Sequence, residues 1–214
     1  MKKITDIYTE YKIMPNLQMH QFRVAAVAFQ ICDSLNIEIN KESILKTCLL
    51  HDMGNIIKFH LNYFPEWNNP EGIEYWQKIQ NDYIDKYGNN EHHATVKIAN
   101  ELGVDSCILD LINSVDPSLV EIHKLDSSFD KKICLYADNR VTPHGIVSIG
   151  ERSLEAKKRY ENHPHSFRDD ARMHFNENLE EIEKQIFSHT KIKPEDINDE
   201  SIVSYLEKLK IFTI

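Results

Sequence analysis

The stretch TCLLHDMGNIIK, residues 47–58, places a histidine and an aspartate side by side at the end of an apolar run. Leu49 and Leu50 indicate a helix that packs into the core, where a further aliphatic residue would be expected. His51 and Asp52 follow instead. A dipeptide of this kind also arises by chance, so its meaning depends on polar residues elsewhere in the chain.

Composition and charge limit the classes of protein to consider. The 214 residues are 41% hydrophobic, enough for a sizeable core, and the formal net charge is -9. This charge argues against general attraction to nucleic acid or to an anionic membrane surface. No run approaches the roughly 18 apolar residues of a membrane span, and the N-terminus lacks the apolar segment of a signal peptide, so we expect a cytoplasmic protein.

The four cysteines are widely spaced and form no CxxC pair. We expect buried free thiols in a reducing compartment rather than disulfides or a zinc–thiolate site. The cysteines are Cys32, Cys48, Cys107 and Cys134.

Helical periodicity runs through nearly the whole chain, and no convincing hairpin or long alternating strand interrupts it, so the predicted fold class is all-α. Glycines at the expected stop positions, Gly54, Gly88 and Gly103, end three of the predicted helices. Residues 59–72, which contain two prolines, read as a loop. The predicted helices are 17–35, 41–53, 71–87, 91–102, 105–115, 130–139, 150–162, 165–189 and 200–210.

Two further polar residues stand in apolar surroundings. His20 lies on the inward face of the predicted helix 17–35. Asp138 lies among apolar residues at the end of the predicted helix 130–139, and because an unpaired buried charge costs several kcal/mol, it needs a partner. If these two residues converge with His51 and Asp52, they form a set of two nitrogen and two oxygen ligands that suits a divalent cation.

Three motifs in this order carry a family resemblance. HxxRV surrounds His20, LLHDxG surrounds His51 and Asp52, and DxRV begins at Asp138. The set resembles the HD-domain superfamily of metal-dependent phosphohydrolases. The resemblance implies that these four residues are the metal ligands. It implies an HD-type helical bundle, expected over residues 1–145, with further C-terminal helices over residues 146–214 packed on the same unit.

The chain also departs from the family pattern. Many catalytic members read HDxGK, whereas Asn55 stands at the lysine position and Lys58 is the next cation. Members with two metals carry extra histidines after the HD pair. His92 and His93 lie in that interval, but no histidine is found near Asn113, so we favour a single metal. The ligand set does not distinguish Mn, Fe, Mg, Co, Ni and Zn.

The resemblance implies hydrolysis of a small phosphate ester, such as a nucleotide or a related phosphomonoester, by metal-activated water. Asp52 would orient or deprotonate the water, and His92 or His93 would protonate the leaving oxygen. A solvated helix start is an equal interpretation of the two histidines. Because of Asn55, an HD-fold binding or sensor protein without hydrolytic activity is the alternative function.

Three cations are candidates for binding the phosphate: Arg23, Lys58 and Arg140. Arg23 could instead pair with a core carboxylate, and Arg140 could be structural. His144 is a weaker candidate for substrate contact. The aromatic residues near the predicted loop could stack on a base or simply hold the loop in place; they are Tyr63, Phe64, Trp67 and Trp76.

An apolar stripe follows the predicted helix 165–189, in which acidic residues fill the intervening positions. Such a stripe packs against the same chain, which we favour, or against a second subunit in a homodimer. Its residues are Phe167, Ala171, Phe175, Leu179, Ile182 and Ile186.

Overall fold

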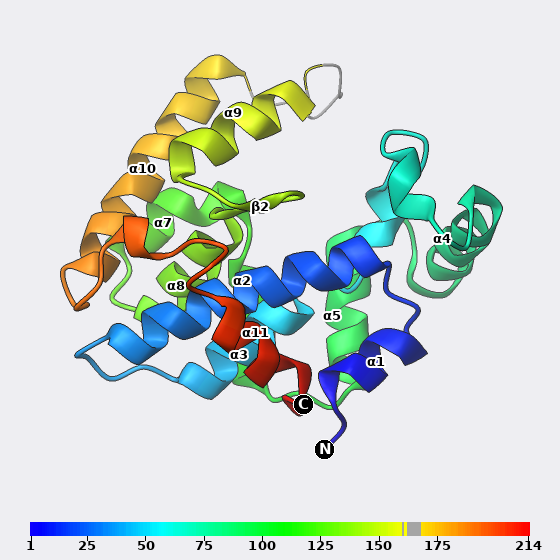
Figure 1. Cartoon of the computed structure of the whole chain (residues 1–214), viewed down its shortest axis with the longest axis horizontal. Helices are drawn as coiled ribbons and strands as arrows, with labels where there is room; N and C mark the ends of the chain where they lie inside the picture. Colours follow the sequence, from blue (N-terminus) through cyan, green and yellow to red (C-terminus); the bar gives the residue numbers. More distant parts are fainter. Residues whose placement is uncertain (160, 162–167) are drawn as a thin grey trace.

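The computed structural model describes residues 1–159, 161 and 168–214 of the chain (Figure 1). Within these ranges it is built mainly from eleven α-helices, which confirms the predicted all-α class. The helices are α1 (Ile4–Glu10), α2 (Pro15–Ser34), α3 (Lys41–Leu50), α4 (Ile73–Tyr87), α5 (Glu91–Glu101), α6 (Ser106–Ser114), α7 (Val120–Leu125), α8 (Phe129–Asp138), α9 (Ile149–Arg159), α10 (Asp169–Phe187) and α11 (Val203–Lys210). Shorter elements are the strands β1 (Val141–Thr142) and β2 (Gly145–Ile146) and the 3-10 turns η1 (Asn55–Lys58), η2 (Pro65–Asn68), η3 (Pro117–Leu119) and η4 (Pro194–Asp196).

Helix α2 is the centre of the core and crosses the middle of the molecule in Figure 1. The consecutive residues Ala25, Ala26, Val27 and Ala28 are fully buried, so α2 is covered on more than one face. Small side chains let neighbouring helices approach closely. Helices α3, α8 and α11 pack against α2, and α6 packs against α3 and α8. This packing brings α8 against α2 and α3, which come much earlier in the chain.

Local signals set most of the helix limits. Gly88 and Gly103 have φ angles of 94° and 72°, as predicted for glycines that end helices. Four polar residues cap helix N-termini, each accepting a hydrogen bond from the backbone N–H three positions along the chain. They are Asn40, Asn90, Asp105 and Ser128.

The prediction that Gly54 ends a helix in a left-handed conformation is wrong. Helix α3 already ends at Leu50, and Gly54 has a φ of -93°. The glycine is needed for a different reason. A Cβ at this position would lie 2.3 Å from the carbonyl oxygen of Glu91 and 2.7 Å from the Cβ of Ala94. Gly54 therefore lets the segment after α3 lie directly against α5.

Other local features differ from the predictions. Helices α1 and α7 were not predicted, and neither was the short hairpin that pairs Val141 with Ile146. Strands of two residues are too short to show an alternating pattern. All four cysteines are free, but Cys107 is exposed rather than buried. The start of the predicted helix 165–189, with Phe167, lies outside the described residues.

The C-terminal helices pack on the rest of the chain. In α10, Leu179, Ile182 and Ile186 are buried, and the helix contacts α7, α8 and α9. The two termini lie together (Figure 1), where the backbone N–H of Lys2 donates to the carbonyl oxygen of Ile214 at 3.0 Å. Among the described residues, no helix has both the length and the apolar character needed to cross a membrane.

Candidate metal centre

Four polar side chains from three parts of the helical core meet at one point. His20 comes from α2, His51 and Asp52 directly follow α3, and Asp138 is the last residue of α8. His20 Nε2 lies 3.1 Å from Asp138 Oδ1 and 3.5 Å from Asp52 Oδ2. His51 Nε2 lies 3.4 Å and 3.6 Å from the same two oxygens. Each histidine therefore faces both carboxylates.

The ligand atoms are close enough to share one ion. One atom each from His20, His51 and Asp52 forms a group in which all separations are within 4.8 Å. Asp138 contacts both histidines of this group. Two imidazole nitrogens and two carboxylate oxygens suit a divalent cation, and the two negative charges neutralise it.

His51 is held in the orientation that a metal ligand needs. Its Nδ1 lies 2.9 Å from the carbonyl oxygen of Cys48, which can only accept, so Nδ1 carries a proton and donates it. Its Nε2 is buried and makes no hydrogen bond. The side chain is only 3% exposed, so water does not satisfy this atom. A buried nitrogen that faces two carboxylates without a hydrogen-bond partner is the observation that best fits a bound cation.

The electrostatics of the cluster also favour positive charge. Burial lowers the pKa of His51, but Asp52 and Asp138 outweigh it and raise this pKa to about 10. Burial raises the pKa of Asp138, but the two histidines that face it, His20 and His51, outweigh burial and hold this pKa well below its usual value. Without an ion, the cluster therefore keeps a proton where a cation would sit.

The backbone around Asp52 is fixed from two sides. The backbone N–H of Asp52 is 3.4 Å from Oε1 of Gln21, the fully buried neighbour of His20 on α2. The backbone N–H of Gly54 donates to Thr95 Oγ1 at 2.9 Å, and this hydroxyl in turn donates to the carbonyl oxygen of Glu91. The HD pair is thus anchored to α2 and α5.

A cleft of about 1290 Å³ opens beside the cluster. It is lined by all four cluster residues and, among the residues predicted for substrate and proton transfer, by Lys58 and His92. Lys58 Nζ lies 3.6 Å from Glu91 Oε1, and His92 Nε2 lies 2.9 Å from Asn113 Oδ1. Both residues stay candidates for the roles predicted for them.

Aromatic residues form another part of the cleft wall. Phe64 and Trp67 are stacked with ring centroids 4.0 Å apart, and Tyr63 meets Phe64 edge-on. All three line the cleft. Trp76, by contrast, is 3% exposed and does not line the cleft. The predicted loop therefore supplies flat apolar surface to the cleft through Tyr63, Phe64 and Trp67.

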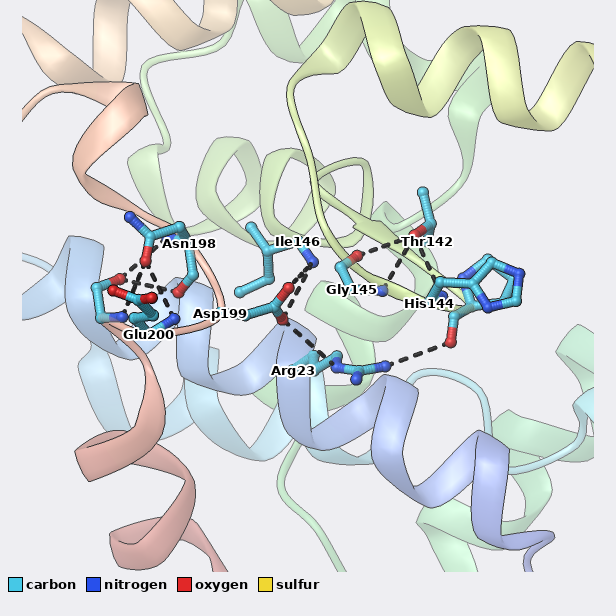
Figure 2. Close-up of polar contacts among 10 residues, drawn as sticks. Arg23, Thr142, His144, Gly145, Ile146, Asn198, Asp199 and Glu200 are labelled. Atoms are coloured by element: carbon cyan, nitrogen blue, oxygen red, sulfur yellow. Dashed lines mark hydrogen bonds and ion pairs between the residues drawn. The ribbon is translucent and has the colours of Figure 1, made fainter.

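Figure 2 shows Arg23 directed toward the hairpin and the C-terminal segment. Its Nη1 donates to the carbonyl oxygen of Pro143 at 3.3 Å, and its Nε lies 3.9 Å from Asp199 Oδ1. The same carboxylate accepts a hydrogen bond from the backbone N–H of Ile146. Arg23 does not line the cleft, so its role in binding phosphate stays a prediction that this position does not support. It pairs with a carboxylate, but with one outside the core.

Arg140 is structural. It is 3% exposed and does not line the cleft. Its guanidinium donates to Tyr136 Oη and to the carbonyl oxygens of Val147, Pro194 and Ile197. These contacts tie α8 to the C-terminal segment and give no support to the prediction that Arg140 binds phosphate.

Two of the histidine candidates also lie outside the cleft. His93 is exposed at the start of α5, where its backbone N–H donates to the cap residue Asn90. His144 is exposed in the turn of the hairpin. Neither lines the cleft. The structure therefore gives no support to the predictions that His93 protonates the leaving group and that His144 contacts substrate, and both stay predictions.

Comparison with protein families identifies the helical domain. Residues 18–116 match the family model described as the HD domain. This part of the chain is an HD domain. The match contains His20, His51 and Asp52 but ends before Asp138, which the fold adds to the site. A search of curated proteins and a search of solved structures each found no match.

Three basic residues of the cleft were not predicted from the sequence. Arg152 and Arg159 come from α9 and Arg172 comes from α10, and all three line the cleft beside the HD domain. No local motif distinguishes them from the other basic residues of a charged region. Only the packing of α9 and α10 reveals which of these residues face the cleft.

Proposed function

We propose that the protein is a metal-dependent phosphohydrolase acting on a small phosphate ester, with a nucleotide or a related phosphomonoester as the first class to test. One observation carries the proposal. His51 Nε2 is buried without a hydrogen-bond partner between two carboxylates, at the wall of a cleft large enough for a small organic phosphate. The membership of residues 18–116 in the HD-domain family supports it.

The residues that would hold the cation are His20, His51, Asp52 and Asp138. A divalent ion held there would withdraw charge from a phosphate oxygen and lower the pKa of a bound water toward neutrality. The protein keeps His51 in the tautomer that exposes Nε2, through its bond to the carbonyl oxygen of Cys48. The carboxylate of Asp52 is 19% exposed, so it can also orient a water in the cleft and accept its proton.

Lys58 and His92 are the cleft residues proposed to act on the substrate. The Lys58 side chain is 45% exposed, and the contact of its ammonium with Glu91 is long enough to be exchanged for a phosphate oxygen. His92 is held by Asn113, and in this proposal it would give a proton to the leaving oxygen. The stacked rings of Phe64 and Trp67 favour a substrate with a flat organic group, which supports a nucleotide.

The test is a substrate panel on chelator-treated protein to which single metals are returned. It contains nucleoside monophosphates, cyclic nucleotides and generic phosphate esters, with phosphate release and disappearance of the ester as readouts. We expect metal-dependent hydrolysis that Asp138→Asn abolishes, because this change removes the charge and little else. Asp110→Asn, an exposed carboxylate of α6, is the matched control and should retain activity.

A binding protein on the same fold is the second candidate function. Asn55 is 7% exposed, lines the cleft and has no ammonium with which to neutralise a phosphate. If the loaded protein binds members of the panel but converts none of them, or if a chelator leaves hydrolysis unchanged, the phosphohydrolase proposal is wrong.

A further inference from the structure

The 3-10 turn η1, which follows the HD pair, determines on which side of the chain Lys58 lies. Backbone N–H groups along this segment donate to the carbonyl oxygen three positions back, at 3.1 Å for Ile57 and 3.2 Å for Phe59. In a 3-10 helix the side chains of residues i and i+3 eclipse each other. Asn55 and Lys58 are related in this way, and both line the cleft. The 3-10 form therefore directs Lys58 to the cleft together with the buried Asn55.

Gln80 holds this turn from behind. It lies on α4, is 8% exposed and does not line the cleft. Its side-chain amide donates to the carbonyl oxygens of Ile56 at 2.6 Å and Phe59 at 2.9 Å, with a longer contact of 3.4 Å to that of Ile57. Carbonyl oxygens at the end of a helix lack partners within it, so a buried donor at this place stabilises the turn. Two of the three carbonyl groups belong to the immediate neighbours of Lys58.

The amide of Gln80 has a single orientation open to it. Carbonyl oxygens only accept hydrogen bonds, so the NH2 group of this amide must face the turn. Its other polar atom also has a partner, because Nε2 of the exposed Gln77 donates to Gln80 Oε1 at 2.9 Å. Gln80 is therefore fixed on α4 and links this helix to η1.

The metal ligands next to the turn have anchors of their own. Gln21 accepts from the backbone N–H of Asp52, and Thr95 accepts from that of Gly54, and both bonds precede η1. These bonds do not involve Gln80. A change at Gln80 therefore acts on the turn and its lysine and leaves the anchors of the HD pair in place.

We propose that Gln80 is a positioning residue for the substrate phosphate, because it holds η1 in the 3-10 form that keeps the Lys58 ammonium at the cleft. Gln80 does not touch the substrate, since it lies behind the turn and outside the cleft. The proposal rests on the proposed function for the role of Lys58 as a phosphate ligand. Without the amide, η1 relaxes and Lys58 is found less often where a phosphate oxygen binds.

The first test measures the turn itself. Gln80→Met keeps a side chain of similar length and removes the donor. We expect the amide hydrogens of residues 55–59 to exchange about tenfold faster in this variant, followed by mass spectrometry on the metal-loaded protein, since a restraint on local opening is lost. Gln185→Met is the matched control, because Gln185 also donates to a backbone carbonyl oxygen, that of Lys124 at 3.2 Å, and does not line the cleft. It should leave the exchange of residues 55–59 unchanged.

The second test measures the binding of a phosphate group. Methylphosphonate carries the charged oxygens of a phosphate ester but no ester bond. Calorimetric titration of the metal-loaded protein should show binding about tenfold weaker in Lys58→Ala and about fivefold weaker in Gln80→Met. In the Lys58→Ala background, Gln80→Met should change the affinity by less than about twofold, because the lysine on which it acts is gone. Metal content by elemental analysis should equal that of the parent in each variant.

A second variant tests the same link if Gln80→Met does not fold. Gln77→Ala changes an exposed side chain and removes the bond that orients the Gln80 amide. We expect it to weaken methylphosphonate binding by about twofold to threefold, and again only when Lys58 is present. An unchanged affinity in Gln77→Ala would then count against the proposal.

Three results would overturn the inference: the exchange of residues 55–59 is unchanged in Gln80→Met, binding weakens equally with and without Lys58, or Gln185→Met has the same effects. Equal weakening would mean that Gln80 supports the fold in general. A parent protein that does not bind methylphosphonate, or a Lys58→Ala variant that binds it as the parent does, would reject the inference as well. The predicted pattern without activity on the ester panel would reject the proposed hydrolysis alone, and activity without this pattern would reject the role of Gln80 alone.

Discussion

His20 Nε2 lies 3.1 Å from Asp138 Oδ1, although the two residues belong to α2 and α8 and only the first lies in the segment matched to the HD-domain family. The same Asp138 oxygen is 3.4 Å from His51 Nε2. A carboxylate that contacts both histidines can hold a proton between them or help to hold a cation. The proton and the cation therefore compete for one place.

This competition predicts that cation affinity rises with pH. Burial lowers the pKa of His51, but Asp52 and Asp138 raise it to about 10, so the metal-free protein carries a proton on Nε2 at neutral pH. The proton must leave before this nitrogen can bind the ion. We expect the association constant for Mn²⁺ to increase about tenfold per pH unit between about pH 6 and pH 8, measured by calorimetry. An affinity that is independent of pH in this range would contradict the assignment of His51.

The adjacent histidines of α5 should differ in their effect on catalysis. His92 lines the cleft and His93 does not. If His92 protonates the leaving oxygen, His92→Ala should lower kcat by about a hundredfold or more, whereas His93→Ala should stay near the parent value. Steady-state kinetics on the best substrate of the panel provide the measurement. Equal losses in the two variants would point to a shared structural role at the start of α5.

Gly54→Ala should destabilise the protein strongly. The new Cβ would lie 2.3 Å from the carbonyl oxygen of Glu91 and 2.9 Å from the backbone nitrogen of Thr95, and helix backbone cannot move as a side chain can. We expect a loss of about 1–3 kcal/mol in the free energy of unfolding, measured by denaturant titration. Gly150→Ala is the control, because nothing lies within 4 Å of its Cβ position. If the two variants are equally stable, the close approach of this segment to α5 is not real.

Arg140→Ala separates a structural role from a substrate role. The change removes the guanidinium that donates to the carbonyl oxygens of Val147 and Ile197 in a mostly buried place, so it should cost more than about 2 kcal/mol of stability. Arg168→Ala, which removes an arginine side chain that is 84% exposed, should change stability by less than about 0.5 kcal/mol. Lost activity with unchanged stability in Arg140→Ala would restore the substrate role.

Short-range patterns in the sequence were enough to predict much of the fold. The apolar spacing of α2 and the glycines after α4 and α5 act within a few residues, so their effects could be read locally. In the sequence, Gly54 resembles these helix-ending glycines. Its role, however, depends on α5, which begins more than thirty positions later. The structure was needed to tell a helix-ending glycine from one required by a close contact.

In the candidate site, too, some residues could be predicted from their local sequence and others depend on how distant helices pack. Asp138 could be selected from sequence because a carboxylate among apolar neighbours needs a partner. Arg23 and Arg140 were selected for their closeness in sequence to His20 and Asp138, but both point toward the C-terminal segment. Arg152 and Arg172 face the cleft because of how α9 and α10 pack, and their positions in a charged region contain no sign of it.

The most direct test of the central claim is the metal content of purified Asp52→Ala. The parent protein and the variant are loaded in turn with Mn, Fe, Mg, Co, Ni and Zn, freed of unbound ion by gel filtration, and examined by elemental analysis. Circular dichroism verifies that both are folded, and Asp110→Ala serves as the matched carboxylate control. We predict that the parent and Asp110→Ala retain a divalent ion and that Asp52→Ala does not, because Asp52 supplies one of two compensating charges. A folded Asp52→Ala with the metal content of the parent would contradict the account.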